Sequence, residues 1–518
     1  YNFSVAKHFF ASFCEDGSGK VSMQDVSDRL LPQCITDELK SDWGEGLQTI
    51  ANGGGFFDMS PIQDNHRLPE SFRNLENGHK YAICDINKGE NIIKYGNPIG
   101  HATEDIKCGD HVHTHNVKTN LSGKMKYTYN PIKYPVDKID TDLTIMGYVR
   151  ENGDIGIRND IWIVNTVGCV NKTAQLLAEK TGAKYFSHPF GCSQLGDDQT
   201  ITQTILKGMV NHPNAGGVLV LGLGCENNNI EVFKKVLGAW DENRVKFLNV
   251  QDYDDEIEKG TELINDLKEN AQKYKREPVH ISKLKVGLKC GGSDGFSGIT
   301  ANPLVGRFCD KLTAMNGSCV LTEVPEMFGA EQLLMQRCEN KEVFDKTVKL
   351  INNFKDYYTR HNQVIYENPS PGNKNGGITT LEEKSLGCIR KGGLSKVVDV
   401  LDYGDRVSKS GLTLLNGPGN DIVAITNLMA AGVHIILFTT GRGTPVGTAV
   451  PTVKISTNAD LAKRKSNWID FDASPTLGGN DLTDELIDYV INVANGEKTK
   501  NEEYKYEEIS IFKDGVTL

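Results

Sequence analysis

Four apolar segments of this chain each end at a cysteine that has a glycine beside it. These segments are residues 161–169, 184–192, 218–225 and 284–290. Each is typical of a buried strand, and open α/β folds bind their ligands at the carboxyl ends of parallel strands. A thiolate there is a good ligand for a soft or borderline metal ion, although one cysteine can equally fill a core as a small apolar residue. The repetition favours a shared site, so we predict that Cys192, Cys225 and Cys290 hold a metal ion, and we rank Cys169 behind them.

Three histidines alternate along residues 111–116. Side chains of a strand point alternately to its two faces, so a strand here would place His111, His113 and His115 on one face. Imidazole titrates near neutral pH, and its nitrogens also bind metal ions. We predict that His113 or His115 is a general base. Histidines on an exposed strand face without any function are the alternative.

A glycine-rich segment follows the strand that ends at Cys290 and runs to residue 303. Glycines let a backbone approach a ligand closely, and small polar side chains can orient that ligand by hydrogen bonds. The segment has neither the GK[ST] of a Walker loop nor the GxGxxG of a dinucleotide site. We therefore predict that Ser293, Asp294 and Asn302 bind a small substrate.

The segment 441–447 follows another apolar run and contains Arg442 and Thr444. An arginine held between glycines can present two parallel N–H groups to a carboxylate, and a turn with a solvated arginine is the alternative. We predict that Arg442 and Thr444 bind the carboxylate of the substrate. The polar loop 368–377 adds Lys374, which could carry a proton if burial lowered its pKa.

The chain has 518 residues, enough for two to four domains. Its net charge of −11 at pH 7 and the lack of a Lys/Arg block argue against a nucleic-acid partner. No apolar run reaches the roughly 18 residues that a membrane-spanning helix needs, so we expect no membrane partner and a cytoplasmic protein. Twelve cysteines are too few for a disulfide scaffold over this length, so we expect reduced thiols. These features are compatible with a homo-oligomer as well as with a monomer.

Hydrophobic patterning divides the chain into parts. Residues 1–65 stay unassigned, residues 66–122 show short strands separated by turns, and residues 123–145 are typical of an extended linker. Strands then alternate with helices over residues 146–275 and again over 283–518, where we place catalysis. The expected fold class is α/β, with a small all-β module followed by two regions whose sheets are largely parallel.

Long motifs resemble the altronate/galactarate dehydratase family, and the likeness covers about residues 76–518. The segment 78–100 resembles the SAF (β-clip) module with which these enzymes begin. The other motifs with this likeness are at residues 191–198, 222–228, 290–303, 322–332, 367–374 and 440–445. Residues 111–116 and 191–198 are more similar to the altronate branch than to the galactarate branch. The opening strands usual in the family's module are not apparent in residues 1–65.

The resemblance implies a hydro-lyase that converts D-altronate to 2-dehydro-3-deoxy-D-gluconate with Fe²⁺ or Mn²⁺ as cofactor. Such a reaction removes a weakly acidic proton next to a carboxylate and expels hydroxide, and a divalent metal can stabilise both charges. The alternatives are dehydration of galactarate or another sugar acid, a non-enzymatic sugar-acid-binding protein, and a nicotinamide oxidoreductase, which the missing GxGxxG disfavours. Three thiolates with one open iron position would also suit an iron–sulfur cluster.

Overall fold

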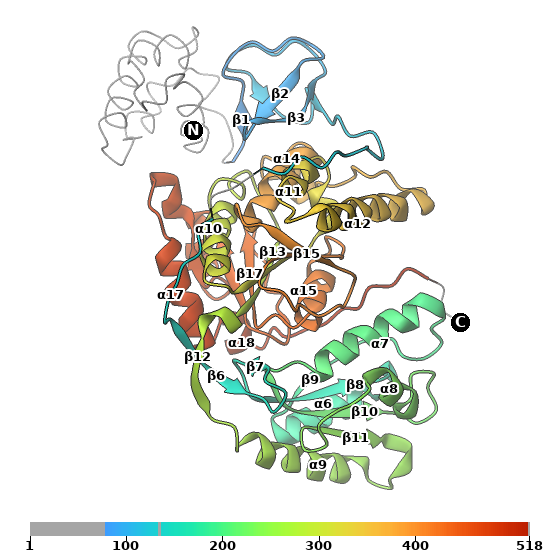
Figure 1. Ribbon diagram of the computed structural model, residues 1–518. Helices are drawn as coiled ribbons and strands as arrows, with labels where there is room; N and C mark the ends of the chain where they lie inside the picture. The colour runs from blue at the N-terminus through green and yellow to red at the C-terminus, as the bar shows by residue number, and fades with distance from the viewer. Residues whose placement is uncertain (1–77, 133–135, 516–518) are drawn as a thin grey trace.

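The computed structural model describes residues 78–132 and 136–515. Figure 1 shows a small β module (blue), a central α/β domain (green) and a C-terminal α/β domain that lies between them. One core cluster joins the β module to the C-terminal domain, and a second joins the C-terminal and central domains. The architecture confirms the expected α/β class with parallel sheets and a small β module. The unassigned segment 1–65 lies outside the described residues.

The β module consists of two small antiparallel sheets. Strands β1 (Lys80–Tyr81) and β4 (His111–Val112) form one, and β2 (Asn91–Lys94), β3 (Asn97–Ala102) and β5 (Val117–Lys118) form the other. Its buried side chains include Ile92, Ile99 and Val112, which belong to the core cluster of the C-terminal domain. The module therefore folds onto that domain and shares its core.

The expected strand over residues 111–116 is wrong beyond Val112. The backbone turns there, since the N–H groups of Asn116 and Val117 both donate to the carbonyl of His113. The Asn116 side chain fixes this turn by accepting from His113 N at 3.0 Å and donating to His111 O at 2.9 Å. An asparagine that bonds its neighbouring backbone competes with strand pairing, which ends β4 after two residues.

The central domain is a four-stranded parallel sheet in the order β11-β10-β8-β9. Its strands are β8 (Asp160–Asn165), β9 (Lys184–Phe186), β10 (Ala215–Gly222) and β11 (Val245–Asn249). Its helices are α6 (Asn171–Thr181), α7 (Gly196–Val210), α8 (Ile230–Leu237) and α9 (Glu256–Ala271). Every residue of β10 is buried, as expected for an apolar strand covered on both faces. The alternation of strands and helices that the sequence predicts is confirmed.

The C-terminal domain contains a seven-stranded parallel sheet in the order β15-β16-β14-β13-β17-β18-β19. The strands are β13 (Lys285–Cys290), β14 (Ser318–Leu321), β15 (Val397–Leu401), β16 (Gly411–Leu415), β17 (Ile435–Thr440), β18 (Thr452–Ser456) and β19 (Phe471–Asp472). From β13 the chain continues to one side of the sheet, and from β17 it continues to the other. The crevice between the carboxyl ends of β13 and β17 is therefore the switch point at which open α/β sheets bind ligands.

Helices α10 (Ala301–Ala314), α14 (Leu381–Cys388), α15 (Asp421–Ala430) and α17 (Thr483–Ala494) surround this sheet. A 3-10 turn (Val324–Met327) and the short helix α11 (Glu331–Met335) precede the long helix α12 (Lys341–Arg360). Pro325 lies in that turn, and Asn340 caps α12 by accepting from Val343 N.

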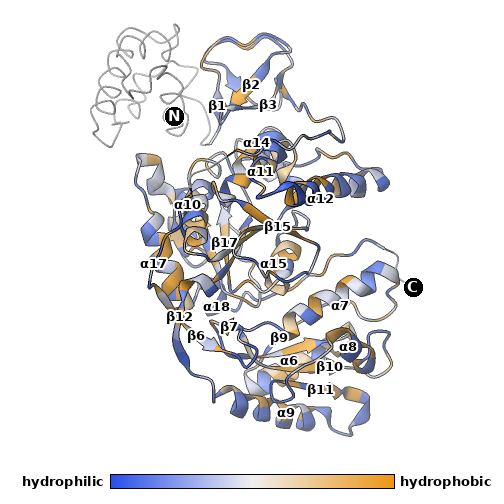
Figure 2. Ribbon diagram, in the orientation of Figure 1, coloured by the Kyte–Doolittle hydropathy of each residue, from blue (hydrophilic) through white to orange (hydrophobic). Residues whose placement is uncertain are grey.

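An antiparallel sheet of β12 (Arg276–His280), β6 (Thr144–Val149) and β7 (Ile155–Gly156) joins the two α/β domains. In Figure 2 the inner strands are mostly orange and the outer helix faces are blue, which agrees with the buried cores. No helix in the described ranges combines the length and the hydropathy needed to span a bilayer.

Candidate active site

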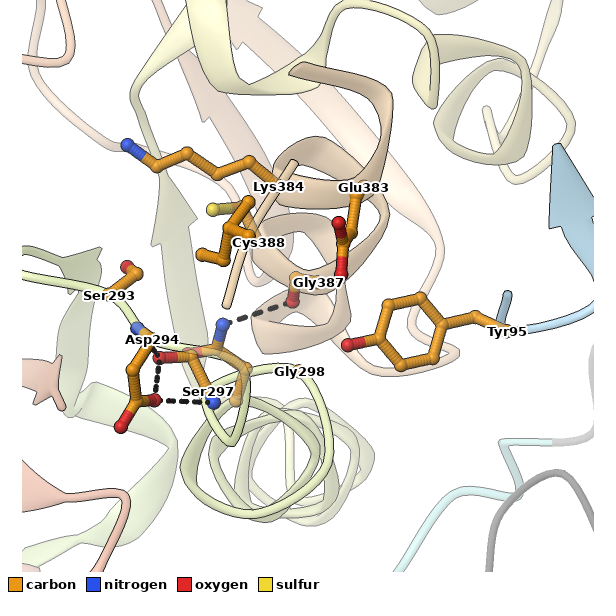
Figure 3. A pocket seen from close by; sticks show the side chains of 11 residues that line it. Tyr95, Ser293, Asp294, Ser297, Gly298, Glu383, Lys384, Gly387 and Cys388 are labelled. Atoms are coloured by element: carbon orange, nitrogen blue, oxygen red, sulfur yellow. Dashed lines mark hydrogen bonds between the residues drawn. The ribbon is translucent and has the colours of Figure 1, made fainter. Parts of the chain in front are cut away.

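A small pocket lies at the switch point. Beside it the loop after β17 meets the loop after β13, since the N–H groups of Gly441 and Arg442 donate to the Gly292 carbonyl at 3.1 and 2.9 Å. The pocket is drawn in Figure 3. Its lining residues are Tyr95, Ser293, Asp294, Ser297, Gly298, Asn302, Ile378, Glu383, Lys384, Gly387 and Cys388. All three structural units near this edge contribute: the loop after β13, helix α14 and the β module.

Two thiols and one carboxylate converge beside this pocket. The sulfur atoms of Cys290 and Cys388 lie 3.3 Å apart, and the Glu326 Oε2 lies 3.4 Å from Cys290 Sγ and 3.0 Å from Cys388 Sγ. All three residues are buried, and their ligand atoms lie within 4.8 Å of one another. Cys290 ends β13 and Cys388 ends α14, so the sheet edge and the helix bring the two sulfurs together. This group has the spacing and donors to hold one metal ion.

Buried lysines surround this group. Lys384 Nζ lies 2.8 Å from Glu326, while Glu323 is 2.5 Å from Lys289 and 3.1 Å from Lys391. Asp421 also pairs with Lys289, at 2.9 Å. Three carboxylates thus face three ammonium groups, and their charges sum to zero as long as both thiols keep their protons. A divalent ion that displaces two thiol protons leaves that balance unchanged.

The pKa values agree with this charge pattern. Hydrogen bonding to Cys290, together with burial, raises the pKa of the Cys388 thiol well above its ordinary value. Burial alone would raise the pKa of Glu326, but Lys384 and the other lysines outweigh it and hold that pKa far below the usual range. Burial likewise opposes the charge of Lys384, yet Glu326 raises the Lys384 pKa above its usual value. Lys384 is therefore an ammonium group at neutral pH, suited to donate hydrogen bonds or a proton and not to accept one.

The loop after β13 contains the three predicted substrate-binding residues, and each has a distinct environment. Asp294 accepts hydrogen bonds from Ser297 N and from Thr457 Oγ1, both at 3.0 Å, so its carboxylate organises the loop. Asn302 Nδ2 donates to the Gly387 carbonyl at 3.0 Å, which ties α10 to α14 (Figure 3). The Ser293 hydroxyl is buried and lacks a hydrogen-bond partner within the described ranges. Ser293 is thus the one of the three whose side-chain polar atom has no partner within the described ranges.

The predicted carboxylate-binding residues lie after β17. Arg442 is exposed and Thr444 is half-buried. The Arg442 backbone is fixed against Gly292, as described above, while Thr444 Oγ1 accepts from Val446 N at 3.3 Å. The Arg442 backbone thus lies beside the loop after β13, and its side chain is exposed.

Four imidazoles cluster on the face of the β module that meets the C-terminal domain. The ligand nitrogens of His79, His111 and His113 lie within 4.8 Å of one another, and the His115 ring centroid is 5.6 Å from that of His111. Burial, followed by the charge of Lys80, lowers the pKa of His113 to about 4, so this imidazole is neutral at neutral pH. The cluster offers both a neutral base and a second set of metal ligands.

The helix that contains Lys374 lies beside this cluster. It belongs to α13 (Pro371–Asn375), and His79 Nε2 is 3.3 Å from the Asn375 carbonyl of the same helix. The close fit here requires glycine: a Cβ on Gly377 would lie 2.2 Å from the Gly78 carbonyl oxygen. The backbone approach thus brings the predicted bases His113, His115 and Lys374 to one border between module and domain.

The structure does not bring all of the predicted metal ligands together. Cys192 and Cys225 are exposed and follow β9 and β10 of the central domain, whereas Cys290 is buried at the end of β13. The sulfur that accompanies Cys290 is that of Cys388, which the strand-end pattern missed because it lies at the end of a helix. A Gly-Cys dipeptide at 387–388 was the available signal.

Three further residues near the site were not predicted as site residues from the sequence. Glu326 lies within the family-like motif 322–332, but no spacing there marks it as a ligand. His79 becomes adjacent to His111 only through the pairing of β1 with β4. Tyr95 reaches the pocket from the β module with a left-handed backbone, φ 56°, and its ring lies 4.6 Å from the Arg390 guanidinium. Each of these placements depends on contacts between distant segments.

Comparison with known proteins identifies the family. The altronate dehydratase of Escherichia coli (strain K12) is 54% identical over 460 residues, which is 86% of this chain and 93% of the relative. This chain belongs to the altronate/galactarate dehydratase family. The altronate dehydratase of Bacillus subtilis (strain 168) is 53% identical over 460 residues, covering 86% of this chain and 92% of the relative. The galactarate dehydratase (L-threo-forming) of Escherichia coli is 32% identical over 489 residues, covering 88% and 92%.

Family models match all three parts of the chain. The SAF domain of altronate/galactarate dehydratases matches residues 61–120, and the second domain of D-galactarate dehydratase/altronate hydrolase matches residues 147–272. The C-terminal domain of D-galactarate/altronate dehydratases matches residues 281–517. The chain is accordingly a dehydratase, that is, a hydro-lyase.

Proposed function

We propose that this protein dehydrates D-altronate to 2-dehydro-3-deoxy-D-gluconate, using Fe²⁺ or, less suitably, Mn²⁺. The observation that carries the substrate is the difference in identity, 54% to an altronate dehydratase against 32% to a galactarate dehydratase over comparable lengths. Both products of the reaction, water and a 2-keto acid, form without a nicotinamide. This fits the lack of a dinucleotide motif after the strands.

Cys290, Glu326 and Cys388 would hold the metal ion, and their chemistry fits iron. Thiolates favour iron or zinc over manganese, whereas an all-oxygen site would favour manganese. A bound divalent ion would act as a Lewis acid toward the substrate oxygens that gain negative charge. The balanced charges around the three ligands, with two thiol protons to release, support a divalent ion.

The side chains of this chain would divide the remaining tasks. Arg442 would bind the substrate carboxylate through two parallel N–H groups of its guanidinium. The Ser293 hydroxyl, which has no hydrogen-bond partner within the described ranges, would orient a substrate hydroxyl. Lys384, an ammonium group at the pocket wall, would donate a proton to the departing hydroxide. His113, His115 and Lys374 are the candidates for the base that removes the α-proton, and all three lie on the module border.

The test follows 2-keto acid formation from D-altronate and from galactarate with no nicotinamide added. We expect faster turnover of D-altronate, loss of activity after chelation and recovery with Fe²⁺. An absolute need for NAD, or a higher kcat/KM for galactarate, would overturn the proposal.

A further inference from the structure

We propose that the central domain binds a four-iron iron–sulfur cluster through Cys169, Cys192 and Cys225. These cysteines follow β8, β9 and β10, which are neighbours in one parallel sheet, so all three leave the same sheet edge. All three are exposed, whereas Cys290 and the other cysteines of the C-terminal domain are buried. A buried cysteine can fill a core as a small apolar residue, but an exposed one gains nothing from packing. Packing therefore does not account for these three.

The loops that contain the three cysteines are in direct contact. Gly168 N, next to Cys169, donates to the Phe190 carbonyl at 2.9 Å, and Asn228 N donates to the Gly191 carbonyl at 3.0 Å. A Cβ on Gly191, next to Cys192, would lie 2.0 Å from the Thr166 carbonyl oxygen, and its φ is +100°. Only glycine permits this approach, so the sequence keeps the three cysteine backbones within one patch.

The three sulfurs, as they stand, lie too far apart for one ion to bind all of them. Two sulfurs bound to one zinc ion at about 2.3 Å cannot lie more than roughly 4.6 Å apart. Within the described ranges the ligand groups that lie within 4.8 Å are the histidine set and Cys290–Glu326–Cys388, so the three exposed thiols are spread more widely. In a four-iron cluster each thiolate binds a different iron, which accommodates the wider spread and leaves one iron without a protein thiolate.

The surroundings of the three cysteines suit an anionic cluster. Cys169, Cys192 and Cys225 lie within five residues of the amino ends of α6, α7 and α8, whose backbone N–H groups attract negative charge. Gln251 Nε2 also donates to Cys225 Sγ at 3.6 Å. Hydrogen bonds to cluster sulfurs are a normal means of setting the cluster's potential.

The test uses full-length protein that is purified without oxygen and reconstituted with ferrous iron, sulfide and a thiol reductant. We expect about four acid-labile sulfides per chain and an electron paramagnetic resonance signal after reduction with dithionite. Cys169→Ser, Cys192→Ser and Cys225→Ser are each expected to lose most of this sulfide. Cys84→Ser changes an exposed cysteine of the β module and should retain it.

Sulfide separates this cluster from the mononuclear iron proposed above, because Cys290→Ser should lose activity and only the mononuclear iron, and should keep the sulfide and the iron of the cluster. Circular dichroism checks that the variants are folded, which the exposure of the three side chains leads us to expect. Reconstituted wild-type protein without acid-labile sulfide would overturn the proposal. So would a triple serine variant that holds as much sulfide as the wild type.

Discussion

Glu383→Gln should detach the β module from the C-terminal domain. Glu383 is 1% exposed at the start of α14 and accepts from Lys80 at 2.9 Å and from Lys94 at 2.6 Å, both in the β module. Glutamine keeps the shape but leaves two buried ammonium groups without their counter-charge. Removing one partner of a buried ion pair costs about 3–5 kcal/mol, which corresponds to a docking equilibrium weaker by about a hundredfold to several thousandfold.

Native-state hydrogen exchange of the β2 and β3 amides measures this docking, since these strands must separate from α14 to exchange. The matched control is Asp85→Asn, which breaks a pair with Lys107 whose side chains are 59% and 71% exposed. An ion pair this exposed contributes little to stability because water and salt screen it, so the control should exchange nearly as the wild type does. If the β2 and β3 amides of Glu383→Gln were as well protected from exchange as those of Asp85→Asn, the argument that the buried charges hold the module would be refuted.

The same contact should weaken in acid. Burial alone would raise the pKa of Glu383, but Lys80 and Lys94 outweigh it and hold that pKa far below its ordinary 4.5. An undocked Glu383 binds a proton more readily than a docked one, so the stabilisation is complete above about pH 4.5 and is lost as the pH falls below it. The protection factors of the β2 and β3 amides, which are exchange rates corrected for the intrinsic pH dependence, should fall in the wild type between pH 7 and pH 3. The Glu383→Gln variant should lack this fall.

Three other predictions concern the site. Cys388→Ser should lose the mononuclear iron and most activity but keep the iron that accompanies sulfide, while Cys84→Ser should leave all three unchanged, as measured by iron and sulfide content after dialysis and by 2-keto acid formation. Arg442→Lys should lower kcat/KM by about tenfold to a hundredfold, mainly through KM, because a lysine cannot form the paired hydrogen bonds to a carboxylate. If His113 is the base, its pKa of about 4 places the acid limb of the kcat/KM profile near pH 4, and His113→Asn should remove that limb whereas His115→Asn should not.

The sequence located one half of the candidate site. Cys290, Ser293 and Arg442 follow apolar strands, and the carboxyl ends of parallel strands meet at one edge, so a local pattern was enough to place them together. Cys388 and Glu326 reach the same point from a helix and a 3-10 turn, which carry no comparable signal. Their positions follow from packing between segments far apart in the chain.

Local patterns also misjudged two elements. The alternating histidines at 111–116 have the period of a strand, but the Asn116 side chain competes for the backbone and turns it. Strand-end cysteines likewise appeared equivalent in the sequence, although only Cys290 belongs to the seven-stranded sheet. Periodicity reports which faces are apolar, and it does not report which sheet a strand joins.

The ion pair between Lys94 and Glu383 joins residues that are 289 positions apart in the sequence. A ribosome that adds about 5–20 residues per second therefore needs roughly 15–60 s to deliver helix α14 after the β module has emerged. During that interval Ile92, Ile99 and Val112 have no partner surface, although they are buried in the finished protein. During synthesis the β module therefore exposes its apolar side chains and leaves Lys94 without its partner carboxylate until α14 has been made. A chaperone that covers exposed apolar surface would act on the chain at this stage.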